Sequence, residues 1–175
     1  MKRVFLFAAL CSGCGEKPPP PTLPAEESIP ATTPEQAFEA RRAAWLAADG
    51  RAIWNTLSAK TRRDSAAKQE SQIASLKAMS DRQLAAACEK YGLTVPQFRR
   101  MNIEDFAAHL ISLVARQNPE LAHRFRETRF LRAEVAGTRA TCTLRTPSGT
   151  EERLVFVAEG GEWRVDDDAT DQAKR

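Results

Sequence analysis

The chain has 175 residues and a formal net charge of +3, from 26 lysines and arginines against 23 aspartates and glutamates. Two of the basic residues, Lys2 and Arg3, belong to the first few positions, and without them the two signs nearly balance. A nucleic-acid-binding domain normally carries a strong basic excess on one face, so this composition argues against a nucleic-acid partner.

The first residues have the pattern of a signal for export. A basic start is followed by an unbroken apolar run over residues 4–10 and by the small residues Ser12 and Gly13, which suit a processing site. The apolar run is far shorter than the roughly 20 residues that a membrane-spanning helix needs. We therefore expect residues 1–13 to be a cleaved signal peptide.

The end of this signal resembles the lipobox of bacterial lipoproteins, in which a small residue precedes the cysteine that receives a diacylglyceryl group. The matching residues are Ser12, Gly13 and Cys14. The family prefers leucine three positions before the modified cysteine, where this chain has Cys11. Cys11 is the alternative acceptor, but Leu10 would then occupy the position of the small residue. The resemblance implies lipidation at Cys14, which holds the protein to a membrane of the bacterial cell envelope. The alternatives are an ordinary secretory signal and a fortuitous hydrophobic start.

Residues 14–33 contain most of the prolines of the chain and few residues that could form a core. This composition is typical of an extended tether. A proline-rich ligand for a signalling domain is the alternative, although readers of such ligands are scarce outside the cytoplasm. Gly15 after the anchor cysteine resembles the sorting signal that sends lipoproteins of enteric-type bacteria to the outer membrane, so we expect the domain to face the periplasm.

About 140 residues follow the tether, which is enough for one domain with its own core. We expect this domain over residues 34–168 and a polar tail over residues 169–175. The acidic residues near the end are interpreted as part of a frayed tail, because hard cations need several ligands in a defined loop. Cys88 and Cys142 remain after the signal and the anchor. Export permits a disulfide between them, and two free buried thiols are the alternative.

Capping residues and apolar spacing predict helices in the first two thirds of the domain. Thr33 caps the first helix, Gln36 follows three residues later, and Asp49 with Gly50 is expected to end it. Its shared face consists of Phe38, Arg41, Trp45 and Ala48. Further helices are expected over residues 51–58, 59–79, 83–92 and 103–118 and from Pro119, with caps at Ser58, Ser80 and Asn102. In the helix over 103–118 the expected apolar stripe is Phe106, Leu110, Leu113 and Val114.

The hydrophobic period then changes to two, which predicts strands over residues 130–136, 139–145, 154–158 and 162–165. The inward positions are expected to be Leu131, Ala133, Val135, Ala140, Cys142, Leu144, Leu154, Phe156, Ala158, Trp163 and Val165. Glu134, Glu152 and Asp166 are assigned to the polar side, so no carboxylate is expected on the inner face. Helices followed by an antiparallel meander predict an α+β domain, in which the N-terminal helices pack on a curved, four-stranded sheet.

The opening helical pair PEQAFEARRAAWLAADGRAIWNTLS and the closing GGEWRVDD resemble the nuclear transport factor 2-like superfamily, in particular its small bacterial lipoproteins of unknown function. The resemblance covers roughly residues 34–168 and implies a cone-shaped α+β fold with a pocket at its open end. The helical stretch over residues 79–119 is additional, and four strands are fewer than this fold usually has.

Members of that superfamily include isomerases, dehydratases and domains that only bind, so the fold does not select an activity. An enzyme would need an acid or base inside an apolar cavity, for which His109 is the candidate, and a structural histidine is the alternative. Trp45, Trp54 and Trp163 are the candidate pocket aromatics, with a role in the core as the alternative. The sequence contains no catalytic, metal or cofactor motif. We expect a noncatalytic module that binds an envelope protein or a small apolar ligand, with an isomerase or dehydratase-type enzyme as the alternative.

Overall fold

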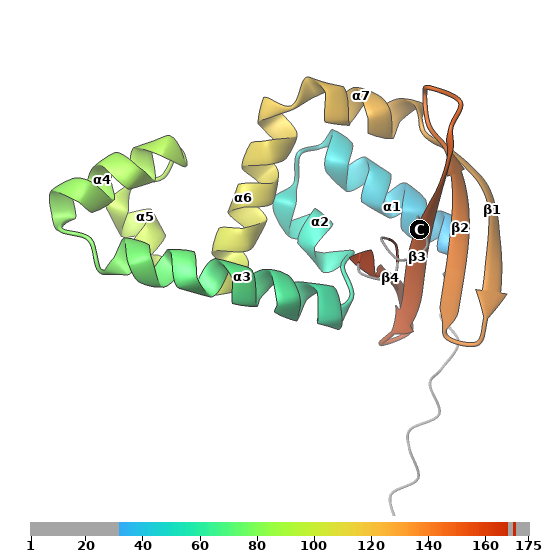
Figure 1. Cartoon of the computed structure of the whole chain (residues 1–175), viewed down its shortest axis with the longest axis horizontal. Helices are drawn as coiled ribbons and strands as arrows, with labels where there is room; N and C mark the ends of the chain where they lie inside the picture. Colours follow the sequence, from blue (N-terminus) through green and yellow to red (C-terminus); the bar gives the residue numbers. More distant parts are fainter. Residues whose placement is uncertain (1–31, 168–169, 171–175) are drawn as a thin grey trace, which may run out of the picture.

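The computed structural model describes residues 32–167 and 170 of the chain. Within these residues seven helices precede four strands; the first helix packs on the sheet, and the last helix packs on the first and the sixth (Figure 1). The predicted α+β class is therefore confirmed. The predicted signal peptide, Cys14 and the tether up to residue 31 lie outside the described residues.

Four of the helices begin at capping residues that the sequence predicts, namely Thr33, Ser58, Ser80 and Asn102. The seven helices are α1 (Pro34–Leu46), α2 (Gly50–Asn55), α3 (Ala59–Lys77), α4 (Asp81–Lys90), α5 (Val95–Arg100), α6 (Ile103–Gln117) and α7 (Pro119–Glu127). At α1, Thr33 Oγ1 accepts from the amide of Gln36 at 3.2 Å, and Gln36 Oε1 accepts from the amide of Thr33 at 2.8 Å. Ser58 caps α3 by accepting from the amide of Thr61 at 3.1 Å. These bonds satisfy amides that a helix start leaves unpaired.

Gly50 has a different place from the one predicted. It does not end α1, which stops at Leu46; it is the first residue of α2, and Asp49 is the cap. The chain turns at Ala48, whose φ is 51°. Glycine is required at position 50 because α2 lies against α6, where an added Cβ would stand 1.9 Å from the carbonyl oxygen of Ala108. The Asp-Gly pair marks a close helix contact here, and the sequence pattern does not distinguish this from a helix end.

The four strands form one antiparallel meander in the order β1-β2-β3-β4, as predicted. Their bounds are β1 (Arg129–Ala136), β2 (Arg139–Arg145), β3 (Glu151–Glu159) and β4 (Glu162–Val165). The register of β1 against β2 shifts between Phe130 and Arg132. As a result Phe130 and Ala133 both pack against the core. The predicted inward residues Leu131 and Val135 do not belong to this core, and Val135 is 56 % exposed.

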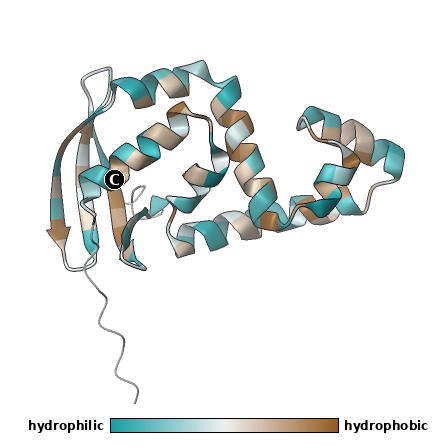
Figure 2. Ribbon diagram, turned by 180° about the vertical axis from the view of Figure 1, so that it is seen from behind, coloured by the Kyte–Doolittle hydropathy of each residue, from teal (hydrophilic) through white to brown (hydrophobic). Residues whose placement is uncertain are grey.

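The part of the chain that the structure describes has two hydrophobic cores. The main core lies between the helices and the sheet and includes Phe38, Trp54, Leu57, Cys142, Phe156 and Val165. The extension core lies under α4 and α5, at the far end from the sheet, and consists of Ile73, Leu76, Leu84, Cys88, Leu93, Phe98 and Phe106 (Figure 1). We call α4 and α5, residues 81–100, the helical extension. The hydrophobic α6 contributes to both cores, whereas α3 is largely hydrophilic (Figure 2).

The burial of two residues differs from the predictions. Val114, expected in the apolar stripe of α6, is 50 % exposed although it shares a helix face with the buried Ala107, seven residues earlier. Thr170, expected in the polar tail, is buried, and its Oγ1 accepts from the amide of Val155 at 3.0 Å. The folded part therefore includes Thr170.

Candidate functional site

A cavity of about 570 Å³ lies among α1, α2, α3 and α6, and we call it the helical cavity. Its apolar wall includes Trp45, Ile53, Trp54, Leu57, Leu110 and Ile111. Its polar side chains include Arg41, Ser65, Gln69 and Asp167. Sites for small organic molecules typically have about 300–1,000 Å³ and mostly apolar walls with a few polar groups. The helical cavity has the size and the composition of such a site.

Three of the residues that line this cavity have a buried polar side-chain atom without a hydrogen-bond partner among the described residues. They are the indole Nε1 of Trp45, the indole Nε1 of Trp54 and the Oε1 of Gln69. Leaving a buried polar group unpaired costs about 1–3 kcal/mol, and native proteins do so rarely. Because the three residues line one cavity, their side chains are the candidate polar contacts of a ligand with two acceptors and one donor.

Arg41 carries a charge at the edge of the same cavity. Its side chain comes from the inner face of α1, the residue is only 8 % exposed, and its Nη1 donates to Thr56 Oγ1 at 2.8 Å. Burial lowers the pKa of Arg41, and the carboxylate of Asp167 acts in the opposite direction. The guanidinium stays protonated, because an arginine side chain is not deprotonated in proteins at ordinary pH.

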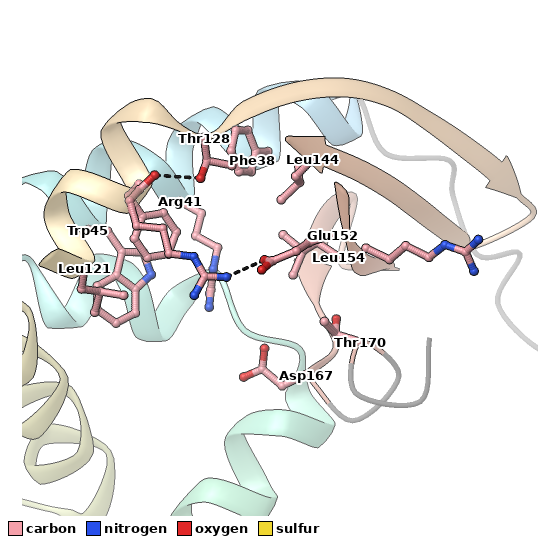
Figure 3. Close-up of a pocket in the computed structure, with 13 residues that line it drawn as sticks. Phe38, Arg41, Trp45, Leu121, Thr128, Leu144, Glu152, Leu154, Asp167 and Thr170 are labelled. Atoms are coloured by element: carbon pink, nitrogen blue, oxygen red, sulfur yellow. Dashed lines mark hydrogen bonds and ion pairs between the residues drawn. The ribbon is translucent and has the colours of Figure 1, made fainter. Parts of the chain in front are cut away.

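A second cavity, of about 240 Å³, lies between the sheet, α1 and α7, and we call it the sheet cavity. Its lining includes Phe38, Leu121, Phe125, Leu144, Glu152 and Leu154. It shares Arg41, Trp45 and Asp167 with the helical cavity, so the two cavities meet at these side chains. Figure 3 shows Arg41 and Trp45 of α1 facing Glu152 of β3 across the sheet cavity.

Glu152 corrects the prediction that the inner face of the sheet has no carboxylate. It pairs with Leu144 on β2 and has the same alternation as Leu154, so it belongs to the inner side. Its Oε2 accepts from Nη2 of Arg124 at 2.5 Å, which joins β3 to α7 across the sheet cavity (Figure 3). The assignment of Glu152 to the polar side was wrong, because residues 152 and 154 share one parity of β3.

The structure separates the four predicted pocket residues. Trp45 and Trp54 both line the helical cavity. His109 lies outside both cavities, and its Nε2 donates to the carbonyl oxygen of Tyr91 at 2.7 Å. Trp163 is buried in the main core, where its Nε1 donates to the carbonyl oxygen of Thr32 at 3.0 Å. The two tryptophans of the helical cavity thus differ from Trp163 in having an unused N–H group.

Cys88 and Cys142 are not brought together. Both thiols are free and buried, Cys88 in the extension core and Cys142 in the main core. The structure therefore has two separate thiols where the sequence left a disulfide open. Burial raises the pKa of both, that of Cys142 to about 12. Each thiol is protonated at neutral pH, which makes it a poor nucleophile and a poor metal ligand.

The described residues were also compared with the requirements of a metal site and of a membrane-spanning helix. Within residues 32–167 and 170, no three side chains from histidine, cysteine, aspartate and glutamate come together as a group that could hold a metal ion. In the same ranges, no helix combines the length and the apolar character that crossing a membrane requires.

Comparison of the chain with protein-family models, with curated protein sequences and with solved structures finds no significant match. The site is therefore interpreted from its own residues. Sequence reasoning missed Gln69, which stands in the polar run of α3 without a signal of its own. The predicted face of α1 correctly places Arg41 with Phe38 and Trp45. A charged residue on this apolar face was the signal in the sequence that could have indicated the site.

Proposed function

We propose that this chain is a lipid-anchored protein of the bacterial cell envelope whose domain binds a small, mostly apolar ligand in the helical cavity without catalysing a reaction. The observation that carries this proposal is the unpaired Trp45 Nε1, Trp54 Nε1 and Gln69 Oε1 inside apolar walls. Polar groups of this kind fix the orientation of a ligand whose affinity comes from apolar contact. The lipobox-like residues before Cys14 and the nuclear transport factor 2-like pattern over residues 34–168 support the anchor and the domain class.

The titratable side chains of the helical cavity favour binding over catalysis. Among the described residues they are Arg41, Tyr91 and Asp167. Arg41 is attracted to Asp167, and the hydroxyl oxygen of Tyr91 accepts from Nε2 of Gln72 at 2.7 Å. A general acid or base must reach the reacting atom and titrate near the working pH. His109, the predicted candidate for that role, lies outside the cavity.

The anchor is tested by the mass of the N-terminal peptide of the mature protein, purified from membranes of the native host. We expect a peptide that begins at Cys14 and carries the added mass of a diacylglyceryl group. The Cys14→Ala variant should yield no such peptide and should leave the membrane fraction. A wild-type peptide that begins at Met1, or one cut elsewhere without lipid, would contradict the anchor.

The cavity is tested with N-phenyl-1-naphthylamine, a neutral apolar dye whose emission rises in apolar surroundings. Ser65 of α3 lines the helical cavity, so Ser65→Phe places a ring inside it. Ala67 is exposed on the same helix, and Ala67→Phe adds the same ring outside. We expect the wild type and Ala67→Phe to bind the dye with equal affinity. The affinity of Ser65→Phe should be lower by a factor of about ten or more. Equal binding by all three proteins, or no binding by any, would contradict a ligand site in this cavity.

A further inference from the structure

We propose that the ligand of the helical cavity is a monoacyl organic anion: an apolar chain ending in a carboxylate that is bound by Arg41, Trp45 and Trp54. This inference rests on the proposed function and adds the chemical class of the ligand. It follows from the kind of polar groups that the cavity presents, their charge and the size of the space beside them.

The unpaired polar groups of the helical cavity are mainly donors. Trp45 and Trp54 each offer one indole N–H without an acceptor, and an indole nitrogen can only donate. Arg41 donates to Thr56, a neutral hydroxyl whose own proton goes to the carbonyl oxygen of Ile53 at 2.7 Å. A carboxylate has about four acceptor sites on two oxygens, so one such group can accept from both indoles and the guanidinium.

Gln69 is compatible with the same head group. Its Oε1 is the unpaired atom, but its amide also has an NH₂ group. Rotation about the last side-chain torsion exchanges the oxygen and the nitrogen within the same space. Gln69 therefore presents a donor to a carboxylate after a rotation that needs no change in the backbone.

The charges near the cavities leave the buried Arg41 with an exposed carboxylate as its counter-charge. Among the described residues, the linings of the two cavities contain the arginines Arg41 and Arg124 and the carboxylates Glu152 and Asp167, while Arg153 follows Glu152 on β3 and has the opposite alternation. Glu152 is already paired with Arg124 at 2.5 Å. Asp167 attracts Arg41 from an exposed position, where water weakens the attraction. The buried guanidinium of Arg41 thus gains most from a second, desolvated negative charge, since hydrogen bonds between charged groups are the strong ones.

The size of the cavity favours one chain. The volume of about 570 Å³ lies in the middle of the range of about 300–1,000 Å³ that holds drug-sized ligands. The aliphatic side chains Ile53, Leu57, Leu110 and Ile111 supply a wall for methylene groups. A single acyl chain fits this space, whereas a phospholipid with two chains needs a larger one.

The experiment measures how well decanoate and 1-decanol displace N-phenyl-1-naphthylamine from the tether-bearing mature chain. The two competitors share a chain length and differ in the charged head. We expect the concentration of decanoate that displaces the dye to be lower than that of decanol by a factor of about ten or more. In Arg41→Met this preference should disappear because decanoate weakens while decanol is unchanged. An equal or greater effect of decanol in the wild type, or a preference that survives Arg41→Met, would overturn the proposal.

A second pair of variants decides the matter if Arg41→Met does not fold. Trp45→Phe removes one unpaired N–H from the cavity, and Trp163→Phe removes an N–H that is already bonded to Thr32 outside it. We expect Trp45→Phe to lower the preference for decanoate severalfold and Trp163→Phe to leave it unchanged. The same effect in both variants would overturn the assignment of the head group to this end of the cavity.

The outcomes separate this inference from the proposed function. Dye binding that Ser65→Phe abolishes, with equal displacement by both competitors, would keep the ligand site and reject the anion. Absence of dye binding would reject the ligand site itself. Mass spectrometry of organic extracts from the protein purified without denaturation then distinguishes the sources: a monoacyl acid supports the proposal, and a diacyl phospholipid contradicts it.

Discussion

The main core and the extension core are built in different ways. The main core joins distant parts of the chain, for example the amide of Ser58 to the carbonyl oxygen of Val165 at 2.8 Å. The extension core joins residues close in sequence, from Ile73 to Phe106, and capping boxes begin α4, α5 and α6. Among the described residues, the buried polar side-chain atoms without partners all belong to residues that line the helical cavity. The polar groups of the helix starts are thus paired in the extension, whereas buried polar atoms are left unpaired at the candidate site. Such departures are common at functional sites.

The two cores meet along α6. Phe106 lies edge-on to Phe98 and Tyr91 in the extension, with ring centroids 5.7 Å apart in each pair. The next two residues, Ala107 and Ala108, face the main core. One turn of helix therefore belongs to both regions, and we expect the two cores to unfold together.

The largest expected effect comes from Phe106→Ala. Phe106 is fully buried, so its removal leaves a cavity and should lower the free energy of unfolding by about 3–5 kcal/mol. Urea denaturation followed by circular dichroism measures the whole chain. Tryptophan fluorescence reports only on the main region, because Trp45, Trp54 and Trp163 lie outside the helical extension. Both midpoints should fall together.

A matched control uses the exposed Val135 of β1, where Val135→Ala should change the free energy of unfolding by less than about 0.5 kcal/mol. If Phe106→Ala lowers only the circular dichroism midpoint and leaves the fluorescence midpoint in place, the extension unfolds by itself. The proposed coupling through α6 would then be wrong.

Gly50→Ala tests the contact of α2 with α6. The added Cβ would meet the carbonyl oxygen of Ala108 at 1.9 Å, so the helices must move apart, at a cost of about 3 kcal/mol in stability. Ala48→Gly is the opposite change two residues earlier. Since Ala48 has a φ of 51°, glycine there should stabilise the fold by about 1 kcal/mol. A neutral Gly50→Ala, measured by thermal unfolding, would show that this contact is loose.

Cys142 predicts a dependence of stability on alkaline pH. Its pKa rises from 9.0 to about 12 on folding, so the unfolded chain loses this thiol proton first as the pH increases. The stability that the neutral thiol contributes is complete below about pH 9 and is lost between about pH 9 and 12. At about pH 10.5 the loss relative to about pH 8 should be near 2 kcal/mol. In Cys142→Ala this component should be missing from urea titrations at the two pH values; an identical pH profile would contradict it.

Gln69→Met gives the smallest expected effect and the opposite sign. Methionine has nearly the same length and removes the unpaired Oε1, so the ligand-free protein should be stabilised by about 1 kcal/mol. Gln72→Met on the same helix removes a side chain that donates to the Tyr91 hydroxyl at 2.7 Å and should destabilise by about the same amount. Thermal unfolding of the two variants should therefore shift in opposite directions. Destabilisation by both would mean that Gln69 is satisfied in the free protein.

Much of the fold could be predicted from short-range patterns. The caps at Thr33, Ser58 and Asn102 each depend on residues within three positions, and the structure has all three. The alternation in residues 139–145 likewise gave the buried Ala140 and Cys142 correctly. Helix α5 was not predicted as a separate element, although Thr94 and Gln97 form a capping box at its start.

The failures concern contacts between distant segments. Gly50 is needed because of Ala108, more than 50 positions away, and no local pattern contains that contact. His109 and Trp54 were both expected near a pocket, but the rotation of α6 that brings Ala107 to the cavity turns His109 away from it. The cavity itself depends on how far apart α1, α3 and α6 stand, which the sequence does not state.

The bond between Trp163 Nε1 and the carbonyl oxygen of Thr32 has a mechanical consequence. Thr32 is the residue through which the preceding chain enters the domain, directly before the cap of α1. A pulling force that arrives from the N-terminal side is thus divided between the first turn of α1 and the short strand β4, which pairs with β3 through Val165 and Trp163. Thr32 is thus fixed to the edge strand of the sheet, and this contact sets the orientation of the domain relative to the chain that precedes it.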